Sequence, residues 1–212
     1  MPSGHILFAA DAGPSGGTFT GPTQLFDFNP TTRTLAPVSP AFPTPSALAG
    51  SAFTMTMLVL PTGQILVSNG STKQWIYTPD GTAPKASTPK INKLKYNGTG
   101  KFTLTGKQLD GVSAGASYGD DNEMDENYPI VRLTDTAGTV YYARTSNWSK
   151  VSVADTTSQT VDFTLKSGTP AGTYSMVVSG AGVQSTPTCI TITAKEAAGK
   201  GVAKKVPLSA CQ

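Results

Sequence analysis

The sequence predicts an all-β protein, and three observations lead to this prediction. Gly and Pro are frequent among the 212 residues and only 14% of the residues are charged, which favours short strands joined by tight turns. Apolar and polar residues alternate in several segments, for example at Val161, Phe163 and Leu165, as expected of strands with one buried face. No segment shows the period of an amphipathic helix.

A repeat organises the first part of the chain. Residues 1–9 match residues 60–68 position by position at an offset of 59, and residues 24–27 resemble residues 74–77 at an offset of 50. Each unit predicts strands joined by a Pro-Gly turn and a polar loop, the pattern of a kelch-type β-propeller blade. The second unit has a strand over Phe53–Val59 before its turn, whereas the first begins at the turn. We therefore expect residues 1–78 to form two incomplete blades.

The remainder of the chain has three parts. Residues 79–90 are a Pro-rich linker without periodicity. Residues 91–194 contain some seven short alternating segments, which predict an immunoglobulin-like, early-set β-sandwich. Residues 195–212 are rich in Lys and Ala and are expected to form a flexible tail. Cys189 and Cys211 leave two interpretations open, a stray thiol or a disulfide that holds the tail.

The net charge of +3 is located in the tail. Residues 195–212 contain four Lys and one Glu, while residues 1–194 carry twelve basic and twelve acidic side chains. A nucleic-acid-binding domain is expected to have a basic face of its own, so this neutral body predicts no nucleic-acid partner. No apolar stretch is long enough to predict a membrane span.

The order of these parts resembles the C-terminal portion of the galactose oxidase and glyoxal oxidase family. The resemblance is carried by residues 58–66, 75–79, 170–178 and 182–185, and residues 116–121 and 128–133 are similar to its bacterial branch. It implies kelch-type blades followed by an immunoglobulin-like C-terminal domain. It also implies an extracellular or cell-envelope location, with this chain as a piece of a longer protein.

The chemistry of that family is expected to be absent here. The resemblance implies a copper site with a Tyr-His pair just before the Leu-Pro-x-Gly turn, where this sequence has Phe53 and Thr54. Neither residue supplies the phenolate or imidazole that such a copper ion needs. The matching loop of the second domain, residues 142–148, contains no histidine, and His5 alone cannot build the site. The sequence therefore predicts a chain that is not an enzyme and holds no copper.

An acidic loop is the first candidate site. Residues 119–127 contain five carboxylates, and oxygen-rich loops suit Ca²⁺. The alternative is a solvated loop that sets a turn. The candidate calcium ligands are Asp120, Asp121, Glu123 and Asp125.

A set of aromatic and polar residues is the second candidate site. An apolar ring face combined with directed hydrogen bonds is typical of sugar recognition. The alternative is that the aromatic residues pack in the core, which we expect for Tyr142 because it shares a face with Val140. The candidate ligand-binding residues are Tyr141, Arg144, Asn147 and Trp148.

Three functional hypotheses follow from the sequence. The leading one is a non-catalytic extracellular β-protein that binds carbohydrate or another partner. The second is that the chain is the C-terminal portion of a larger galactose oxidase-like enzyme whose catalytic residues lie upstream. The third is a structural subunit whose open blades are completed by other chains.

Overall fold

The computed structural model describes residues 1–16, 18–38, 48–114, 128–200, 202 and 204–208. The protein is all-β: the one α-helix of the described residues is the single turn α1(Ala194–Ala197). Within the same residues no helix has the length and apolar character needed to cross a membrane. The chain divides into two compact units, which are considered separately below. Unit 1 is Met1–Pro84 with Ser113–Glu126, and unit 2 is Lys85–Val112 with Asn127–Gln212.

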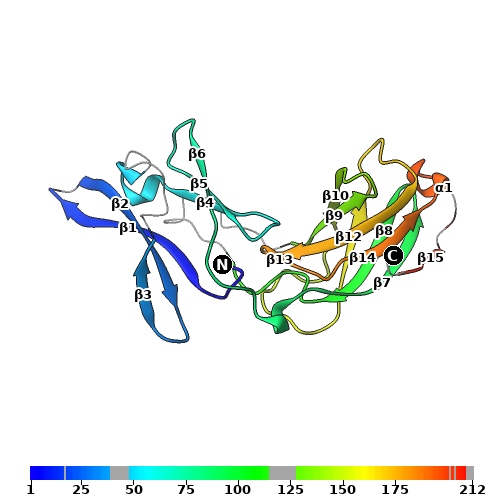
Figure 1. Ribbon diagram of the computed structural model, residues 1–212, viewed down its shortest axis with the longest axis horizontal. Coiled ribbons are helices and arrows are strands. Elements are labelled where there is room, and N and C mark those ends of the chain that lie inside the picture. The colour runs from blue at the N-terminus through cyan, green and yellow to red at the C-terminus, as the bar shows by residue number, and fades with distance from the viewer. Residues whose placement is uncertain (17, 39–47, 115–127, 201, 203, 209–212) are drawn as a thin grey trace. The chain divides into compact units, whose positions relative to one another are not determined.

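Unit 1 contains two three-stranded antiparallel sheets, each with its strands in chain order (Figure 1). In both sheets, each strand therefore pairs with the next strand along the chain. The first sheet consists of β1(Ile6–Ser15), β2(Thr18–Asn29) and β3(Thr34–Pro37), and the second of β4(Thr56–Val59), β5(Ile65–Ser68) and β6(Gln74–Tyr77).

The sequence repeat is visible as a repeated turn. The Gly4 N–H donates to the Met1 carbonyl at 2.9 Å, and the Gly63 N–H donates to the Leu60 carbonyl at the same distance. Both glycines have a positive φ, +85° and +87°, which glycine adopts without the steric cost that other residues incur. The strand after each turn begins at an equivalent position, at Ile6 in β1 and at Ile65 in β5.

The core of unit 1 uses opposite faces of the two repeats. In β5, Ile65 and Val67 are buried. Their equivalents in β1, Ile6 and Phe8, are 51% and 36% exposed, whereas β1 directs the alternate residues Leu7 and Ala9 at this core. The face that is buried in the second sheet is therefore exposed in the first.

The segment before the second turn differs from the sequence prediction. A strand was expected over Phe53–Val59, but residues Ala52–Thr54 form the 3-10 helix η3 and β4 begins at Thr56. The Thr54 N–H donates to the Ser51 carbonyl at 3.1 Å, and the Met55 N–H donates to the Ala52 carbonyl at 3.0 Å. These two short-range bonds compete with pairing to β5, because strand pairing would require an extended backbone here.

Unit 2 is one nine-stranded antiparallel sheet that curls into a half-barrel. The strand order is β13-β12-β9-β10-β11-β8-β7-β15, with β14 also paired to β12. Strand β10 pairs with β9 through residues 140–143 and with β11 through residues 144–146, so the sheet bends where β10 changes partner. The strands are β7(Lys90–Gly98), β8(Lys101–Lys107), β9(Ile130–Asp135), β10(Val140–Ser146), β11(Gln159–Thr164), β12(Gly172–Gly180), β13(Val183–Gln184), β14(Thr188–Ile192) and β15(Lys204–Val206), preceded by the 3-10 helix η4(Lys85–Ser87).

The core of unit 2 is built around a stack of aromatic rings. Phe102 of β8 and Phe163 of β11 are cross-strand partners, and their rings are nearly parallel with centroids 5.0 Å apart. Tyr96 of β7 lies 5.0 Å from Phe102. All three side chains are fully buried. Burial of such rings supplies much of the hydrophobic free energy of a small domain.

Part of the segment expected to be a flexible tail is ordered. Thr193 and Glu196 form a capping box at the start of α1, and Lys204 Nζ lies 3.2 Å from Glu196 Oε1. Strand β15 then pairs with β7, which buries Val206 to 6% exposure. The Lys-rich composition conceals this order because the pairing partner, β7, lies about a hundred residues earlier in the sequence.

Of the two cysteines, the structure describes only Cys189. Cys189 lies on β14, is 4% exposed and is not a free thiol. Cys211 lies outside the described residues. The interpretation of Cys189 as a stray thiol is therefore wrong.

We predict that Phe163→Ala lowers the free energy of unfolding of unit 2 by about 3–5 kcal/mol, because it removes a buried ring and leaves a cavity. Val151→Ala, at a side chain that is 62% exposed, should change it by about 0.5 kcal/mol or less. Urea unfolding can be followed by Trp148 fluorescence in a Trp75→Phe background. Equal midpoints for the two variants would contradict a core at this ring stack.

Candidate functional site

Strand β10 separates the predicted site residues onto two faces. Ala143 is buried and Tyr141 is half-buried, with its ring edge-to-face against Tyr174 at 5.8 Å. Tyr142 and Arg144 point to the opposite, exposed face, where Tyr142 is 47% exposed. The expectation that Tyr142 lies in the core is therefore wrong. Tyr141 packs against the core and does not share a surface with Arg144.

Asn147 belongs to a chain of hydrogen-bonded side chains that crosses the outer face of the sheet. The Asn147 amide donates to Asp162 Oδ2 at 2.9 Å, and the Thr103 hydroxyl donates to the other oxygen of Asp162. The Asn97 amide donates in turn to the Thr103 hydroxyl at 2.6 Å. We call Asn97, Thr103, Asp162 and Asn147 the polar row.

Local backbone geometry helps to place Asn147 at the end of this row. Asn147 follows the last residue of β10 and has φ of +53°. Asn adopts this left-handed conformation more readily than most residues. Sequence reasoning selected Asn147 but missed Asp162. The signal was present, because Asp162 alternates with the apolar residues Val161 and Phe163 and so had to face outward.

Next to Asn147 lies a pair of exposed aromatic rings. Trp148 is 37% exposed and Tyr128 is 42% exposed, and their centroids are 5.4 Å apart. The Trp148 indole N–H donates to the Thr145 hydroxyl at 3.2 Å, which fixes the orientation of the ring. We call Tyr128 and Trp148 the aromatic pair. The sequence indicated Trp148 but not Tyr128, because the contact joins segments about twenty residues apart.

The arrangement suits non-covalent recognition. Ring faces bind apolar patches of a ligand, and the polar row offers amide, hydroxyl and carboxylate groups for hydrogen bonds. Within the part of the chain that the structure describes, no three His, Cys, Asp or Glu side chains gather as metal ligands. His5 is in unit 1, with Nδ1 3.0 Å from Asp27 Oδ1. That the chain is not an enzyme remains a prediction.

The other residues singled out in the sequence lie elsewhere. The candidate calcium ligands Asp120, Asp121, Glu123 and Asp125 fall outside the described residues. At the positions compared with copper ligands, Phe53 is 51% exposed and the Thr54 hydroxyl donates to the Ser51 carbonyl at 2.7 Å. Both belong to unit 1.

A buried carboxyl group lies in unit 2 that the sequence did not reveal. Asp110 is 2% exposed and accepts a hydrogen bond from the Gln159 amide, while Gln159 Oε1 accepts from the Leu109 N–H at 2.7 Å. Burial raises the pKa of Asp110 to about 6; the negative charge of Asp155 adds to this, and the Gln159 hydrogen bond opposes it. In the folded protein this carboxyl is therefore neutral only below about pH 6, whereas an ordinary carboxyl is ionised from about pH 4 upwards.

We predict that unit 2 becomes less stable as the pH rises from about 4 to about 6. The folded protein holds the Asp110 proton more tightly than the unfolded chain, whose pKa is near 3.8, so the stabilisation present at low pH is lost as the pH rises through this window. Urea midpoints between pH 4 and 7 would measure it. Asp110→Asn should flatten the dependence, whereas Asp155→Asn should retain most of it. An unchanged slope in Asp110→Asn would contradict the assignment.

Comparisons with known proteins do not add an identity to this geometry. No protein-family model matches the chain, no curated protein matches it, and no solved structure matches it.

Proposed function

We propose that this chain is a non-catalytic carbohydrate-binding β-protein that works outside the cell or in the cell envelope. The observation that carries the proposal is the exposed aromatic pair beside the hydrogen-bonded polar row. The proposal includes the relationship to the galactose oxidase and glyoxal oxidase family, with kelch-type blades in unit 1 and an immunoglobulin-like domain in unit 2. The repeated Pro-Gly turns and the three-stranded sheets support that relationship.

The physical argument rests on preorganisation. A sugar ring has an apolar C–H face and a rim of hydroxyls, and it is complemented by an aromatic face with fixed polar groups beside it. The Trp148 indole is already held by Thr145, and Asp162 is already held by Thr103 and Asn147. Binding would therefore cost little side-chain entropy.

We predict that Trp148→Ala weakens glycan binding about tenfold or more, as expected for loss of an aromatic anchor. Trp148→Phe retains a ring and should lose less. Phe53→Ala is the matched control, because it removes an aromatic side chain that is 51% exposed on unit 1. Calorimetric titration with the glycans that score highest on an array gives the affinities. Equal affinities for the wild type and Trp148→Ala would exclude the aromatic pair as the site.

A second candidate function is assembly through unit 1. Its first sheet exposes two cross-strand rows of apolar side chains, Ile6-Phe28-Leu35 and Phe8-Phe26-Pro37. Ile6 and Leu35 are 51% and 54% exposed, and the rings of Phe8 and Phe26 stack at 5.5 Å. A continuous apolar face of this kind favours association. We call these six residues the apolar face.

The repeat indicates what would cover the apolar face. The equivalent positions in the second sheet, Ile65 and Val67, belong to the core cluster of unit 1, which also contains Leu25 of the first sheet. The second sheet exposes its own apolar row, Leu58-Leu66-Ile76, on its other side. We infer that this row of a second copy covers the apolar face. Such head-to-tail contacts between unlike surfaces produce rings or filaments.

For this second function, we predict a molar mass that increases with protein concentration in light scattering. Phe8→Asp should reduce the association, because it places a charge in the apolar face. Val151→Asp puts the same charge at an exposed site on unit 2 and should not. A monomeric mass at every concentration would exclude assembly of this chain by itself.

A further inference from the structure

The two units carry opposite charges, which the neutral sum over residues 1–194 conceals. By sequence, the residues of unit 2 include fourteen Lys or Arg and five Asp or Glu, a formal charge of +9. The residues of unit 1 include two Lys or Arg and eight Asp or Glu, a formal charge of −6. Unit 2 is thus a strongly basic body in its own right.

Seven of the cations of unit 2 lie on one face of its sheet. Residues that are directly opposite in an antiparallel pair point to the same side, so the register assigns the face. Lys205 is opposite Lys95, which is opposite Thr103, and Lys90 is opposite Lys107. Further along, Lys101 is opposite Thr164, which is opposite Arg144. The members of this basic face are Lys90, Lys93, Lys95, Lys101, Lys107, Arg144 and Lys205, all of them exposed.

This arrangement is electrostatically unfavourable in the free protein. Lys95–Lys205 and Lys90–Lys107 are like-charge pairs directly opposite each other, which destabilises a sheet. None of the seven cations forms an ion pair with another described residue. The one carboxylate on the same strands and side is Asp162, and it is already engaged by Thr103 and Asn147. A bound anion would relieve the repulsion.

Protection of sheet edges explains only part of the pattern. Lysines on edge strands hinder unwanted pairing with other chains, and this accounts for Lys205 on β15 and for Lys90 and Lys93 beyond the reach of β15. It does not account for Lys95, which lies where β7 is paired on both sides, or for Lys101, which lies where β8 is paired on both sides. For these two lysines, a bound ligand is a better explanation than protection of a sheet edge.

The side chains among the cations favour a glycan over a nucleic acid. Threonine hydroxyls lie between them at Thr103, Thr105 and Thr160, all half-buried on the same face, and hydroxyls both donate to and accept from sugar hydroxyls. The aromatic residues of β7, β8 and β11 all point into the core. Successive unpaired bases stack on several exposed rings along a basic surface, whereas on the described strands of this face the exposed ring is Tyr142, beside Arg144 on β10. The interior strands of a sheet do not enter the major groove of a duplex.

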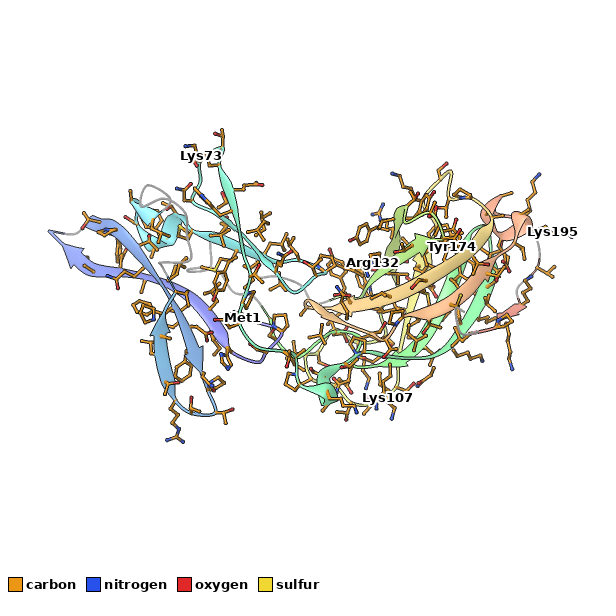
Figure 2. All side chains as sticks on the ribbon, in the orientation of Figure 1. Met1, Lys73, Lys107, Arg132, Tyr174 and Lys195 are labelled. Carbon is orange, nitrogen blue, oxygen red and sulfur yellow. The ribbon has the colours of Figure 1, made fainter. Side chains whose placement is uncertain are left out.

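We propose that the basic face binds an acidic polysaccharide, one that carries carboxylate or sulfate groups along its chain. This inference rests on the proposed function and specifies its ligand class. The polar row connects the two surfaces, because Thr103 is the cross-strand partner of Lys95 at one end and Asn147 precedes Trp148 at the other. A linear glycan lying across β7, β8, β11 and β10 would place its charges on the lysines and one sugar against the aromatic pair. Figure 2 shows Lys107 among the side chains of this unit.

Binding of the full chain to four probes tests the proposal by calorimetric titration. Dextran and dextran sulfate differ only in charge, oligogalacturonate supplies carboxylates instead of sulfates, and a single-stranded oligothymidylate supplies phosphates. We expect the chain to bind dextran sulfate or oligogalacturonate. The probe that binds more tightly shows whether the natural ligand carries sulfate or carboxylate groups. We expect weaker binding of the oligothymidylate. The affinity should fall as salt is raised, because the cations are exposed.

The variant is Lys93→Gln/Lys95→Gln/Lys107→Gln, and the matched control is Lys195→Gln, which removes an exposed lysine on α1. The triple variant should lose about tenfold in affinity for the acidic glycan and show a shallower salt dependence, as expected for three exposed ionic contacts. The control should change neither. The thermal midpoint of the triple variant should equal or exceed that of the wild type, because repulsion is relieved, and this shows that the variant is folded.

The outcomes separate this inference from the proposed function. Binding of dextran that depends on Trp148, with no effect of the triple variant on any probe, would overturn the acidic ligand and leave carbohydrate binding intact. Binding of oligothymidylate as tight as that of the acidic glycans would overturn the glycan in favour of a nucleic acid. If acidic-glycan binding is lost in the triple variant but unchanged in Trp148→Ala, the basic face is the binding surface and the aromatic pair is excluded from it. No binding of any probe would overturn both.

Discussion

The register between β8 and β11 is the constraint on which the surface of unit 2 depends. Phe102 and Phe163 face each other in the core and stack in parallel. A slip of one residue in either strand would turn that strand's ring to solvent and bury its polar neighbours instead. Because the rings fix the register, Thr103 and Asp162 must lie opposite each other on the outer face. The polar row is thus a direct consequence of how the core packs.

The sequence predicted local features of the fold better than long-range ones. Alternation of apolar and polar residues identified strands, and the repeated Pro-Gly turns identified the two sequence repeats within unit 1. Both signals are local, because each lies within about ten residues of sequence. Local alternation does not show how the strands of unit 2 join into one curled sheet, because β10 changes partner between Ala143 and Arg144 and no local pattern encodes such a change. Order after Ala194 was missed for the same reason, since Val206 is buried by pairing with Leu94.

The sequence predicted only some of the candidate site residues, because it did not show which face of β10 is buried. The stretch from Val140 to Ala143 has apolar residues at both alternating positions, so sequence alone could not decide which face is buried. The structure buries the small Ala143 and half-buries Tyr141, which leaves Tyr142 outside. The even balance of charge over residues 1–194 does not hold for each unit separately. Summing over residues 1–194 combined an acidic unit with a basic one, and only the division of the chain into units separates the two.

The apolar face of unit 1 and the basic face of unit 2 respond differently to salt, because one is made of apolar side chains and the other of charged ones. The apolar face of unit 1 would associate through removal of apolar area from water, which excluded salts such as sulfate strengthen. The basic face of unit 2 would bind through exposed charges, whose attraction weakens with added salt because salt shortens the Debye length, beyond which exposed charges are largely screened. Added sulfate should therefore strengthen self-association and weaken glycan binding. The two processes can be told apart when both are measured over the same series of salt concentrations. The positive charge of unit 2 also opposes assembly through unit 1, because each added copy brings another positively charged unit 2. A polyanion bound to unit 2 would reduce this repulsion between copies.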